Sequence, residues 1–555
     1  MQRLFTRQGA TLPETPWEDY PRPQLRRAEW LCLNGEWTLE TQGRSAGILV
    51  PFCAESLLSG LAEAPRPGEE LVYSRSFTVP ESWRGRRVIL HFGAVMRASA
   101  VSVNSRELCR HENGYLPFEL DVTDVLRDGE NSLEVRAVND LDTRYPSGKQ
   151  SAKRGGMWYT PCSGIWQSVW LEPVPEKHVR SLKITTGADF AEIEAEGADE
   201  GEIELEGRRI PMRGGRARIE LPEPRLWSPE DPYLYPFTLT AGEDRVESYF
   251  ALRTLEIKSV GGAERLCLNG RPYFFNALLD QGYWSDGLYT PASPEGYEKD
   301  ILTMKSLGFN TLRKHIKLEP ERFYYDCDRL GMIVFQDMVN NGGYSFLRDT
   351  LLPTLGLRST SDRGLHPDRE GREIFLRSME ETVKGLYNHP SICLWTIFNE
   401  GWGQFCADEA YERLKELDPS RFVDSSSGWF AQRLSDVESR HIYFGPIRLG
   451  REKRPQLLSE FGGYVWKSPE HSFNLDKTYG YRIFKTREAF VRALRELYAS
   501  LIPLVRKGLC GAVYTQVSDV EDETNGLFTF DRELLKIEPE ELKELAEALR
   551  AEINK

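Results

Sequence analysis

The 555-residue chain has few of the features that mark membrane and secreted proteins. No window approaches the roughly 18 apolar residues that span a bilayer, so no membrane association is expected. The N-terminal stretch MQRLFTRQGATLPETPWEDY has no apolar core of signal-peptide length. The nine cysteines are scattered, odd in number and without CxxC pairs, which favours reduced thiols. These absences predict a cytoplasmic protein.

Basic clusters and metal-ligand patterns are also missing. The formal net charge is -14, and no long run of Lys and Arg stands out. Nucleic-acid binding is therefore not expected, because phosphate contacts need clustered basic side chains. No His, Cys, Asp or Glu cluster has convincing metal-ligand spacing. The sequence predicts no essential metal and no cofactor.

The first half of the chain reads as β-structure. Its length predicts two to four domains, and 40% hydrophobic with 28% charged residues is typical of a soluble globular protein. The runs RRVILHFGAV, SAVSVNSREL and NSLEVRAV are short and β-rich, separated by Gly, Asn and Asp turns. Pro173 and Pro175 interrupt a strand and mark a boundary between two predicted domains. We expect a β-sandwich over residues 1–175 and a smaller one over 176–255.

From residue 256 to 555, apolar strands alternate with helical patterns. Buried parallel strands read as continuous apolar runs and need crossover helices, so eight such units predict a (β/α)8 TIM barrel. The helix between the fifth and sixth strands is faint, and an open doubly wound sheet is the less favoured alternative. The eight predicted strands are PYFFNAL, FNTLRK, MIVFQDM, SICLWTIFNE, RFVDSS, RHIYFG, PQLLSEF and LCGAVYTQ.

Two carboxylates end opposite strands of this barrel. Glu400 closes the fourth strand in LWTIFNEGWG, and Glu460 closes the seventh in PQLLSEFGGY. Taken singly, each could equally cap a helix or pair with an Arg. Strand tips four and seven face each other across a barrel mouth, where barrel chemistry takes place. Two carboxylates across a pocket can hydrolyse a glycosidic bond, one as proton donor and the other as nucleophile or base.

An ordered set of motifs resembles glycoside hydrolase family two, the family of β-galactosidases, β-glucuronidases and β-mannosidases. The resemblance implies a jelly roll, an immunoglobulin-like sandwich and a catalytic TIM barrel in that order. The jelly roll is marked by LNGEWTLE, VPFCAES and SGIWQSVWLE, and the second domain by LWSPEDPYLY and ALRTLEI. Barrel strands one, two, four and seven are marked by LNGRPYFFNALL, GFNTLRKHI, HPSICLWTIFNEGWG and LLSEFGG.

The same resemblance implies residue roles. Glu400 would be the acid/base and Glu460 the nucleophile of a retaining mechanism. Asn399 would hydrogen-bond the sugar 2-hydroxyl. Arg313, at the second strand tip, would hold Glu460 through a charge-assisted hydrogen bond. Tyr443 matches the family tyrosine beside the nucleophile, although it could be a core residue.

Several positions depart from the family pattern. NALLDQGYW puts Asp280 and Gln281 near the first strand tip, as sugar contacts or as plain loop residues. Trp158 stands where β-galactosidases and β-glucuronidases carry an Asp, and it could stack on a sugar or pack in the core. Glu523 and Asn525 replace the Asn-x-Lys with which β-glucuronidases hold the sugar carboxylate, and a glutamate there would repel a uronate.

Other polar and aromatic residues near strand tips are weaker candidates. Asp337 ends the third strand and could bind sugar hydroxyls, tune Glu400 or cap a helix. Gln516 and Asp519 follow the eighth strand and could bind sugar or shape the loop. An aromatic platform could come from any of four residues, each of which could also be ordinary packing: Trp284, Trp402, Trp429 and Trp466.

These features predict a retaining exo-β-glycosidase that hydrolyses a terminal neutral sugar, β-galactosidase-like. Its partner is a glycoside or oligosaccharide substrate, and a homo-oligomer could help to close the site. The alternatives are another glycone (β-mannoside, β-glucosaminide, β-galactofuranoside or arabinoside, with β-glucuronide least favoured) and a non-catalytic carbohydrate-binding protein. A magnesium site of the β-galactosidase type stays open.

Overall fold

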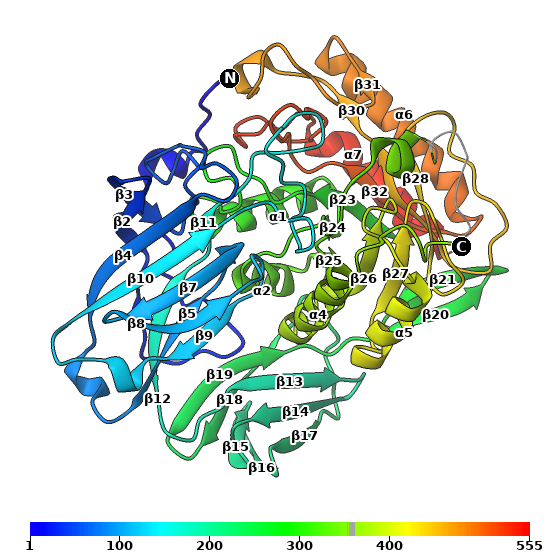
Figure 1. The fold of residues 1–555 in the computed structure, drawn as a ribbon. Helices are drawn as coiled ribbons and strands as arrows, with labels where there is room; N and C mark the ends of the chain where they lie inside the picture. The colour runs from blue at the N-terminus through cyan, green and yellow to red at the C-terminus, as the bar shows by residue number, and fades with distance from the viewer. Residues whose placement is uncertain (352, 354–360, 555) are drawn as a thin grey trace.

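A computed structural model describes residues 1–351, 353 and 361–554. The chain forms three successive units, coloured from blue to red in Figure 1: an N-terminal β-sandwich, a middle β-domain and a C-terminal barrel. This is the predicted combination of jelly roll, immunoglobulin-like domain and TIM barrel. The boundaries at residues 175/176 and 255/256 stay a proposal. Among the described residues, no helix is long and apolar enough to cross a membrane.

The N-terminal sandwich consists of two antiparallel sheets, ordered β3-β2-β4-β10-β7-β8 and β1-β12-β5-β9. Alternating residues face its core, as in β10, where Leu133, Val135 and Ala137 are buried. A small pair, β11-β6, completes it. The strands are β1 (Leu31–Cys32), β2 (Gly35–Thr41), β3 (Arg44–Val50), β4 (Glu70–Thr78), β5 (Arg87–Phe92), β6 (Val95–Met96), β7 (Ala98–Val103), β8 (Arg106–His111), β9 (Phe118–Asp121), β10 (Glu130–Val138), β11 (Gly164–Ile165) and β12 (Val169–Val174).

The middle domain has its own apolar core, around Ile193, Ile203 and Leu239. Its strands form an antiparallel sheet in the order β13-β14-β17-β16-β15-β18-β19. They are β13 (Ser181–Thr186), β14 (Phe190–Glu196), β15 (Glu200–Leu205), β16 (Arg208–Arg213), β17 (Arg216–Glu220), β18 (Tyr235–Ala241) and β19 (Asp244–Phe250).

All eight predicted barrel strands form, and they pair in parallel in the order β27-β26-β25-β24-β23-β32-β29-β28. The sheet closes between β27 and β28 through side chains: Ser439 Oγ lies 2.9 Å from Asp424 Oδ1. Residues 428–437 between these strands contain no helix, which explains the faint pattern there. The strands are β23 (Phe275–Asp280), β24 (Thr311–Lys314), β25 (Ile333–Asp337), β26 (Ile392–Asn399), β27 (Phe422–Ser427), β28 (Glu438–Ile442), β29 (Gln456–Gly462) and β32 (Leu509–Thr515).

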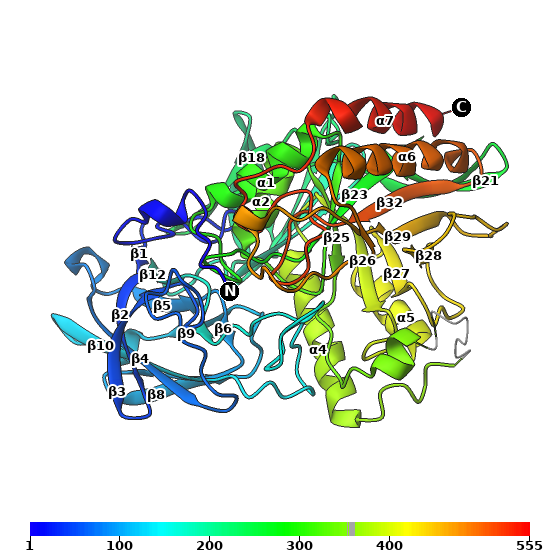
Figure 2. The same cartoon turned by 90° about the horizontal axis from the view of Figure 1, so that it is seen from above.

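The barrel helices lie outside the strands, with α6 and α7 side by side in Figure 2. They are α1 (Glu295–Ser306), α2 (Glu321–Leu330), α4 (Arg369–Leu386), α5 (Ala407–Leu417), α6 (Arg487–Val505) and α7 (Pro539–Glu552). Small β-pairs, 3-10 turns and one π-helical turn complete the described structure: β20 (Leu255–Val260), β21 (Ala263–Leu268), β22 (Arg271–Pro272), β30 (Tyr464–Val465), β31 (Arg482–Ile483), Gly9–Thr11, Glu81–Trp83, Thr123–Val125, Pro469–His471 and Phe346–Leu351.

One loop of the N-terminal sandwich reaches the carboxyl-terminal mouth of the barrel. It connects β10 to β11 and spans residues 139–163. Its Ser147 N–H donates to the Asn340 carbonyl at 3.0 Å, and its Tyr159 hydroxyl donates to the Glu523 carboxylate. The mouth is therefore built from two domains.

Candidate active site

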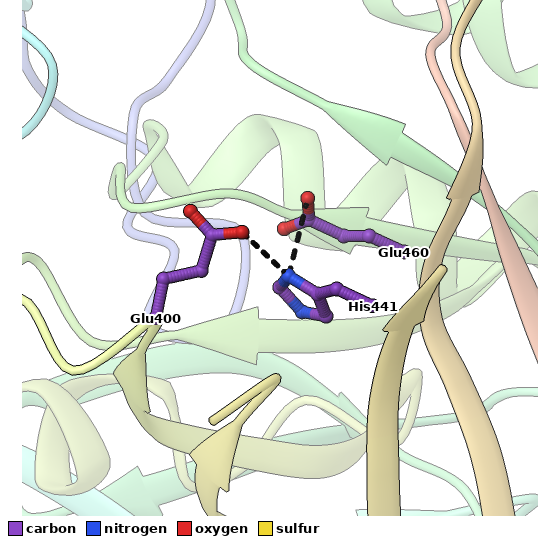
Figure 3. A group of neighbouring side chains, drawn as sticks. All are labelled: Glu400, His441 and Glu460. Carbon is purple, nitrogen blue, oxygen red and sulfur yellow. Dashed lines mark hydrogen bonds and ion pairs between the residues drawn. The ribbon is translucent and has the colours of Figure 1, made fainter. Parts of the chain in front are cut away.

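The two predicted catalytic carboxylates meet in the barrel mouth. Glu400 follows the end of β26, and Glu460 lies in β29. One oxygen from each lies within 4.8 Å of the other and of His441 Nδ1. Figure 3 shows the three side chains together. Retaining glycosidases place their carboxyl groups about 5–5.5 Å apart, whereas inverting enzymes leave about 6.5–9.5 Å for a water. The spacing fits retention.

The NEGWG sequence holds Glu400 in a tight turn at the strand tip. Glu400 has a φ of 52°, in the left-handed region that non-glycine residues rarely adopt. Its N–H donates to the Ser427 carbonyl at 2.9 Å, which ties the turn to the next strand. A Cβ on Gly401 would lie 2.2 Å from the Phe430 ring, so glycine is required there. Strained backbone of this kind is concentrated at functional sites.

Glu460 lies among hydrogen-bond donors and positive charges. Arg313 Nη1 donates to its Oε1 at 3.2 Å, and the Tyr443 hydroxyl donates to its Oε2. Burial by itself raises the pKa of Glu460, but in the acid range where Glu460 titrates the charges of His441, His315 and Arg313 outweigh burial and lower the pKa to about 2. Glu460 is thus ionised at neutral pH, as a nucleophile must be.

Arg313 connects the residues around it. Its side chain is 1% exposed and donates from Nε to Asp337 at 3.0 Å and from Nη2 to the Asn399 Oδ1 at 2.8 Å. Nη1 also donates to the Ser459 carbonyl at 2.9 Å. Because the Asn399 oxygen accepts from Arg313, its amide N–H groups are left to donate toward a ligand.

Asp337 and Asp280 lie outside the residues that line the pocket, and their predicted contacts with sugar stay a prediction. Asp337 accepts from Arg313 Nε and lies 2.7 Å from His315 Nδ1. Asp280 accepts from Lys314 Nζ at 2.6 Å and from the Gly282 N–H at 2.9 Å. Each carboxylate is held by a cation on the neighbouring second strand, and these ion pairs support the floor of the barrel mouth.

Three residues from the departures line the pocket: Gln281, Trp158 and Glu523. Gln281 follows the first strand, and Trp158 arrives from the sandwich loop. The Trp158 ring lies 5.1 Å from Trp402 and 5.0 Å from Tyr344, centroid to centroid, at edge-on angles. The three rings form an aromatic wall of the pocket.

Other candidates lie outside the pocket lining. Asp519 pairs with Lys536 at 2.6 Å, and Gln516 donates to the Asn525 side chain at 2.8 Å. These contacts stabilise the eighth loop, which is the loop-shaping alternative, and sugar binding by either residue stays a prediction. Three tryptophans lie outside the pocket lining, in line with the packing alternative: Trp284, Trp429 and Trp466.

Sequence reasoning missed several pocket residues. His441 precedes Tyr443 by two positions at the sixth strand, so the period-two pattern of a strand could have flagged it. His315 directly follows the second strand, within the motif GFNTLRKHI. No local motif marks the residues that come from loops. The missed residues include Lys149, Met157, His315, Tyr344, His441, Tyr479 and Tyr481.

The pocket also holds one further carboxylate and one cation. Glu523 accepts from the Tyr159 hydroxyl and from Asn525 Nδ2 at 3.0 Å. Lys149 Nζ lies 5.9 Å from the centre of the Tyr159 ring. No carboxylate in the described part of the chain forms an ion pair with Lys149 at 4.0 Å or less.

Glu400, His441 and Glu460 are close enough to share a metal ion. The 2.8 Å contact between His441 Nδ1 and Glu400 Oε1 has the length of a hydrogen bond, in which Nδ1 carries the proton. A ligating Nδ1 would have to give up that proton. The absence of a required metal stays a prediction.

Comparison with known proteins identifies the family. Models of glycosyl hydrolases family 2 match the sugar-binding domain at residues 23–175, the middle domain at 176–253 and the TIM barrel domain at 264–446. The chain therefore belongs to glycosyl hydrolase family 2.

Among the relatives is a β-galactosidase of Aeromonas hydrophila, 32% identical over 474 residues, which cover 75% of this chain and 43% of that protein. The chain thus spans less than half of that relative's length. A β-D-glucuronidase structure from Dictyoglomus thermophilum aligns with a TM-score of 0.76 at 19% identity, covering 95% of this chain and 98% of that one. An Eisenbergiella tayi β-galacturonidase bound to galacturonate aligns with a TM-score of 0.69 at 22% identity, with 95% and 98% covered. Both structures support the fold.

Proposed function

We propose that the protein is a retaining exo-β-glycosidase. Glu460 attacks the anomeric carbon while Glu400 donates a proton to the departing glycosidic oxygen, which leaves a covalent glycosyl–Glu460 ester and an ionised Glu400. Glu400 then takes a proton from water, whose oxygen attacks the same carbon and releases Glu460. The separation of the two carboxylates, within 4.8 Å, carries this proposal.

An exo mode of action follows from the loop that crosses the mouth. Lys149, Met157 and Trp158 come from the N-terminal sandwich and form one wall of the pocket. An internal sugar would need a groove open at both ends, whereas a pocket closed on one side accommodates a terminal sugar. The aglycone would leave past the aromatic wall of Trp158, Tyr344 and Trp402.

For the sugar, we propose a neutral glycone of the β-galactoside type. The Aeromonas hydrophila relative carries the name β-galactosidase. Glu523, a carboxylate with two hydrogen-bond donors beside it, faces the pocket and would repel a sugar carboxylate. The alternative glycones are β-mannoside, β-glucosaminide, β-galactofuranoside and arabinoside, and a non-catalytic carbohydrate-binding protein is the rival of another class.

A β-uronide is the second candidate, because the positive charge of Lys149 favours a negatively charged sugar. This lysine lines the same pocket without a carboxylate partner among the described residues and could bind a sugar carboxylate. The structural similarity to a galacturonate-bound enzyme makes β-galacturonide the uronide to test. A cytoplasmic location and a homo-oligomeric state also remain proposals.

A panel of nitrophenyl glycosides tests the function. It should contain β-galactopyranoside, β-galacturonide, β-glucuronide, β-mannoside, β-glucosaminide and β-galactofuranoside, with Glu460→Gln as the inactive control. Cleavage of β-galactopyranoside that is lost in Glu460→Gln supports the first proposal. Preferred cleavage of a uronide, reduced in Lys149→Met and increased in Glu523→Gln, supports the second. Binding of sugars without turnover of any glycoside favours the carbohydrate-binding rival.

A further inference from the structure

We propose that His441 is a positioning residue that holds the acid/base Glu400 through its Nδ1–H group. The proposal rests on the proposed function, since it assigns Glu400 as the proton donor. His441 lies in β28, and none of its side chain is exposed. Figure 3 shows its ring between the two carboxylates.

The contacts of the ring are asymmetric. Nδ1 lies 2.8 Å from Glu400 Oε1 and 3.6 Å from Glu460 Oε2, so Glu400 is the hydrogen-bond partner. Nε2 lies 3.1 Å from the Ser427 hydroxyl. These are the groups that face the two ring nitrogens, and they come from three different strand ends.

The partners define which nitrogen carries the proton. Oε1 of Glu400 only accepts hydrogen bonds when the acidic proton is on Oε2, and the ionised Glu460 carboxylate also only accepts, so the ring nitrogen that faces both has to donate. Nε2 of a neutral imidazole is then the acceptor, and the Ser427 hydroxyl can donate to it. Ser427 therefore sets the orientation and tautomer of the ring, as second partners of functional histidines commonly do.

This arrangement assigns different tasks to the two oxygens of Glu400. Oε1 accepts from His441, whereas no hydrogen bond to Oε2 occurs among the described residues. The acidic proton thus belongs on Oε2. When it moves to the glycosidic oxygen and the C–O bond breaks, negative charge develops on the carboxylate, and the Nδ1–H···Oε1 bond strengthens. An interaction that strengthens in the transition state accelerates the step.

The surrounding packing leaves the ring little freedom. Gly428 has a φ of +94°, and a Cβ there would lie 2.9 Å from the imidazole. The centre of the Trp429 ring lies 5.5 Å from that of the imidazole. His441 is therefore fixed in position before the substrate binds, which is what a preorganised hydrogen bond needs.

The first test compares leaving groups. His441→Leu removes the donor but keeps the bulk, and His441→Asn restores an N–H near the position of Nδ1. With phenyl glycosides, which need acid assistance, we expect His441→Leu to lower kcat/KM roughly 10- to 100-fold, the value of one charge-assisted hydrogen bond. With dinitrophenyl glycosides, which leave without a proton, the loss should stay within about threefold. His441→Asn should recover most of the phenyl glycoside activity.

A merely structural histidine gives a different result. The loss would then be equal for both leaving groups, or His441→Asn would be as poor as His441→Leu, and either result overturns the proposal. Ser427→Ala removes a single hydroxyl and serves as the variant with the least risk to folding. It should show the same dependence on the leaving group in weaker form.

A second readout does not need the correct sugar. Nitrogen NMR of histidine-labelled protein should show the proton of His441 on Nδ1, and Glu400→Gln should shift that signal. A proton on Nε2, or a signal that ignores Glu400→Gln, overturns the proposal. If the intact protein cleaves no glycoside, the proposed function fails, while this measurement still decides the role of His441.

Discussion

Replacement of Arg313 by lysine should remove the hydrogen bond that Arg313 donates to the proposed nucleophile Glu460. Arg313 donates to acceptors on Asp337, Ser459, Glu460 and Asn399 from three different nitrogens. A lysine keeps the positive charge but has one donor atom on a flexible stem. The lysine ammonium group cannot reach acceptors on both sides of the former guanidinium, so the hydrogen bonds to Glu460 and Asn399 are the ones that we expect to be lost.

The size of the effect follows from those two bonds. Both bonds are donated by the charged guanidinium, and a hydrogen bond to a charged group contributes about 1.5–3 kcal/mol. Together they amount to roughly 3–6 kcal/mol of transition-state stabilisation. At about 1.36 kcal/mol for each factor of ten, Arg313→Lys should lower kcat/KM roughly 150- to 25,000-fold.

The assay is steady-state hydrolysis of the glycoside that the intact protein cleaves, with thermal unfolding measured alongside. Arg421→Lys is the matched control: Arg421 is also buried in the barrel, where it donates to Asp418 at 2.7 Å and to the Ile392 carbonyl at 2.8 Å. It precedes β27 and so lies at the opposite end of the barrel from the pocket. Arg421→Lys should change stability alone. An equal kinetic loss in both variants, or an Arg313→Lys enzyme within about threefold of the intact protein, would refute the reasoning.

Three further changes test the pocket. Tyr443→Phe removes a hydrogen bond to ionised Glu460 and should lower kcat roughly 10- to 100-fold, measured by steady-state kinetics. Trp158→Ala opens the aromatic wall and should raise KM about tenfold with a smaller change in kcat, which an unchanged KM would contradict. The pKa of Glu460 lies at about 2 in the fold against its usual 4.5, so its ionised form stabilises the protein above pH 4.5, and this contribution is lost as the pH falls toward 2. The Tm difference between the intact protein and Glu460→Gln should therefore narrow from pH 5.5 to pH 3, and a constant difference would contradict the shift.

The barrel was readable from the sequence because its strands are buried on both faces. Such strands appear as apolar runs, and all eight predicted runs became parallel strands. The one faint helix corresponds to residues 428–437, where β27 continues to β28 without a helix. A segment without a helix shows no helical periodicity, so the weak pattern between the fifth and sixth strands was the one sign in the sequence that the helix is absent.

The site was readable only in part, because a strand tip does not reveal where its side chain turns. Asp280 and Asp337 follow the same pattern as Glu400, yet each is held by a cation of the neighbouring strand, Lys314 or Arg313. Such pairing depends on register between strands that are more than twenty positions apart. A sequence motif identifies a single residue, but whether its side chain enters the pocket or forms an ion pair depends on the three-dimensional arrangement of the strands.

Residues supplied by another domain were out of reach for the same reason. Lys149 lies in a loop of the N-terminal sandwich and enters the pocket because that loop bonds to the barrel through Ser147 and Tyr159. Trp158 was noticed only because the family pattern has a different residue there.

Trapping of the glycosyl–enzyme tests the central claim most directly. The protein should be incubated with the 2-deoxy-2-fluoro form of the β-glycoside that it cleaves, digested, and analysed by mass spectrometry. The account predicts one added sugar on the peptide that contains Glu460, and none in Glu460→Gln. A label on a different residue, or hydrolysis that releases the sugar with inverted configuration and no label, would contradict it.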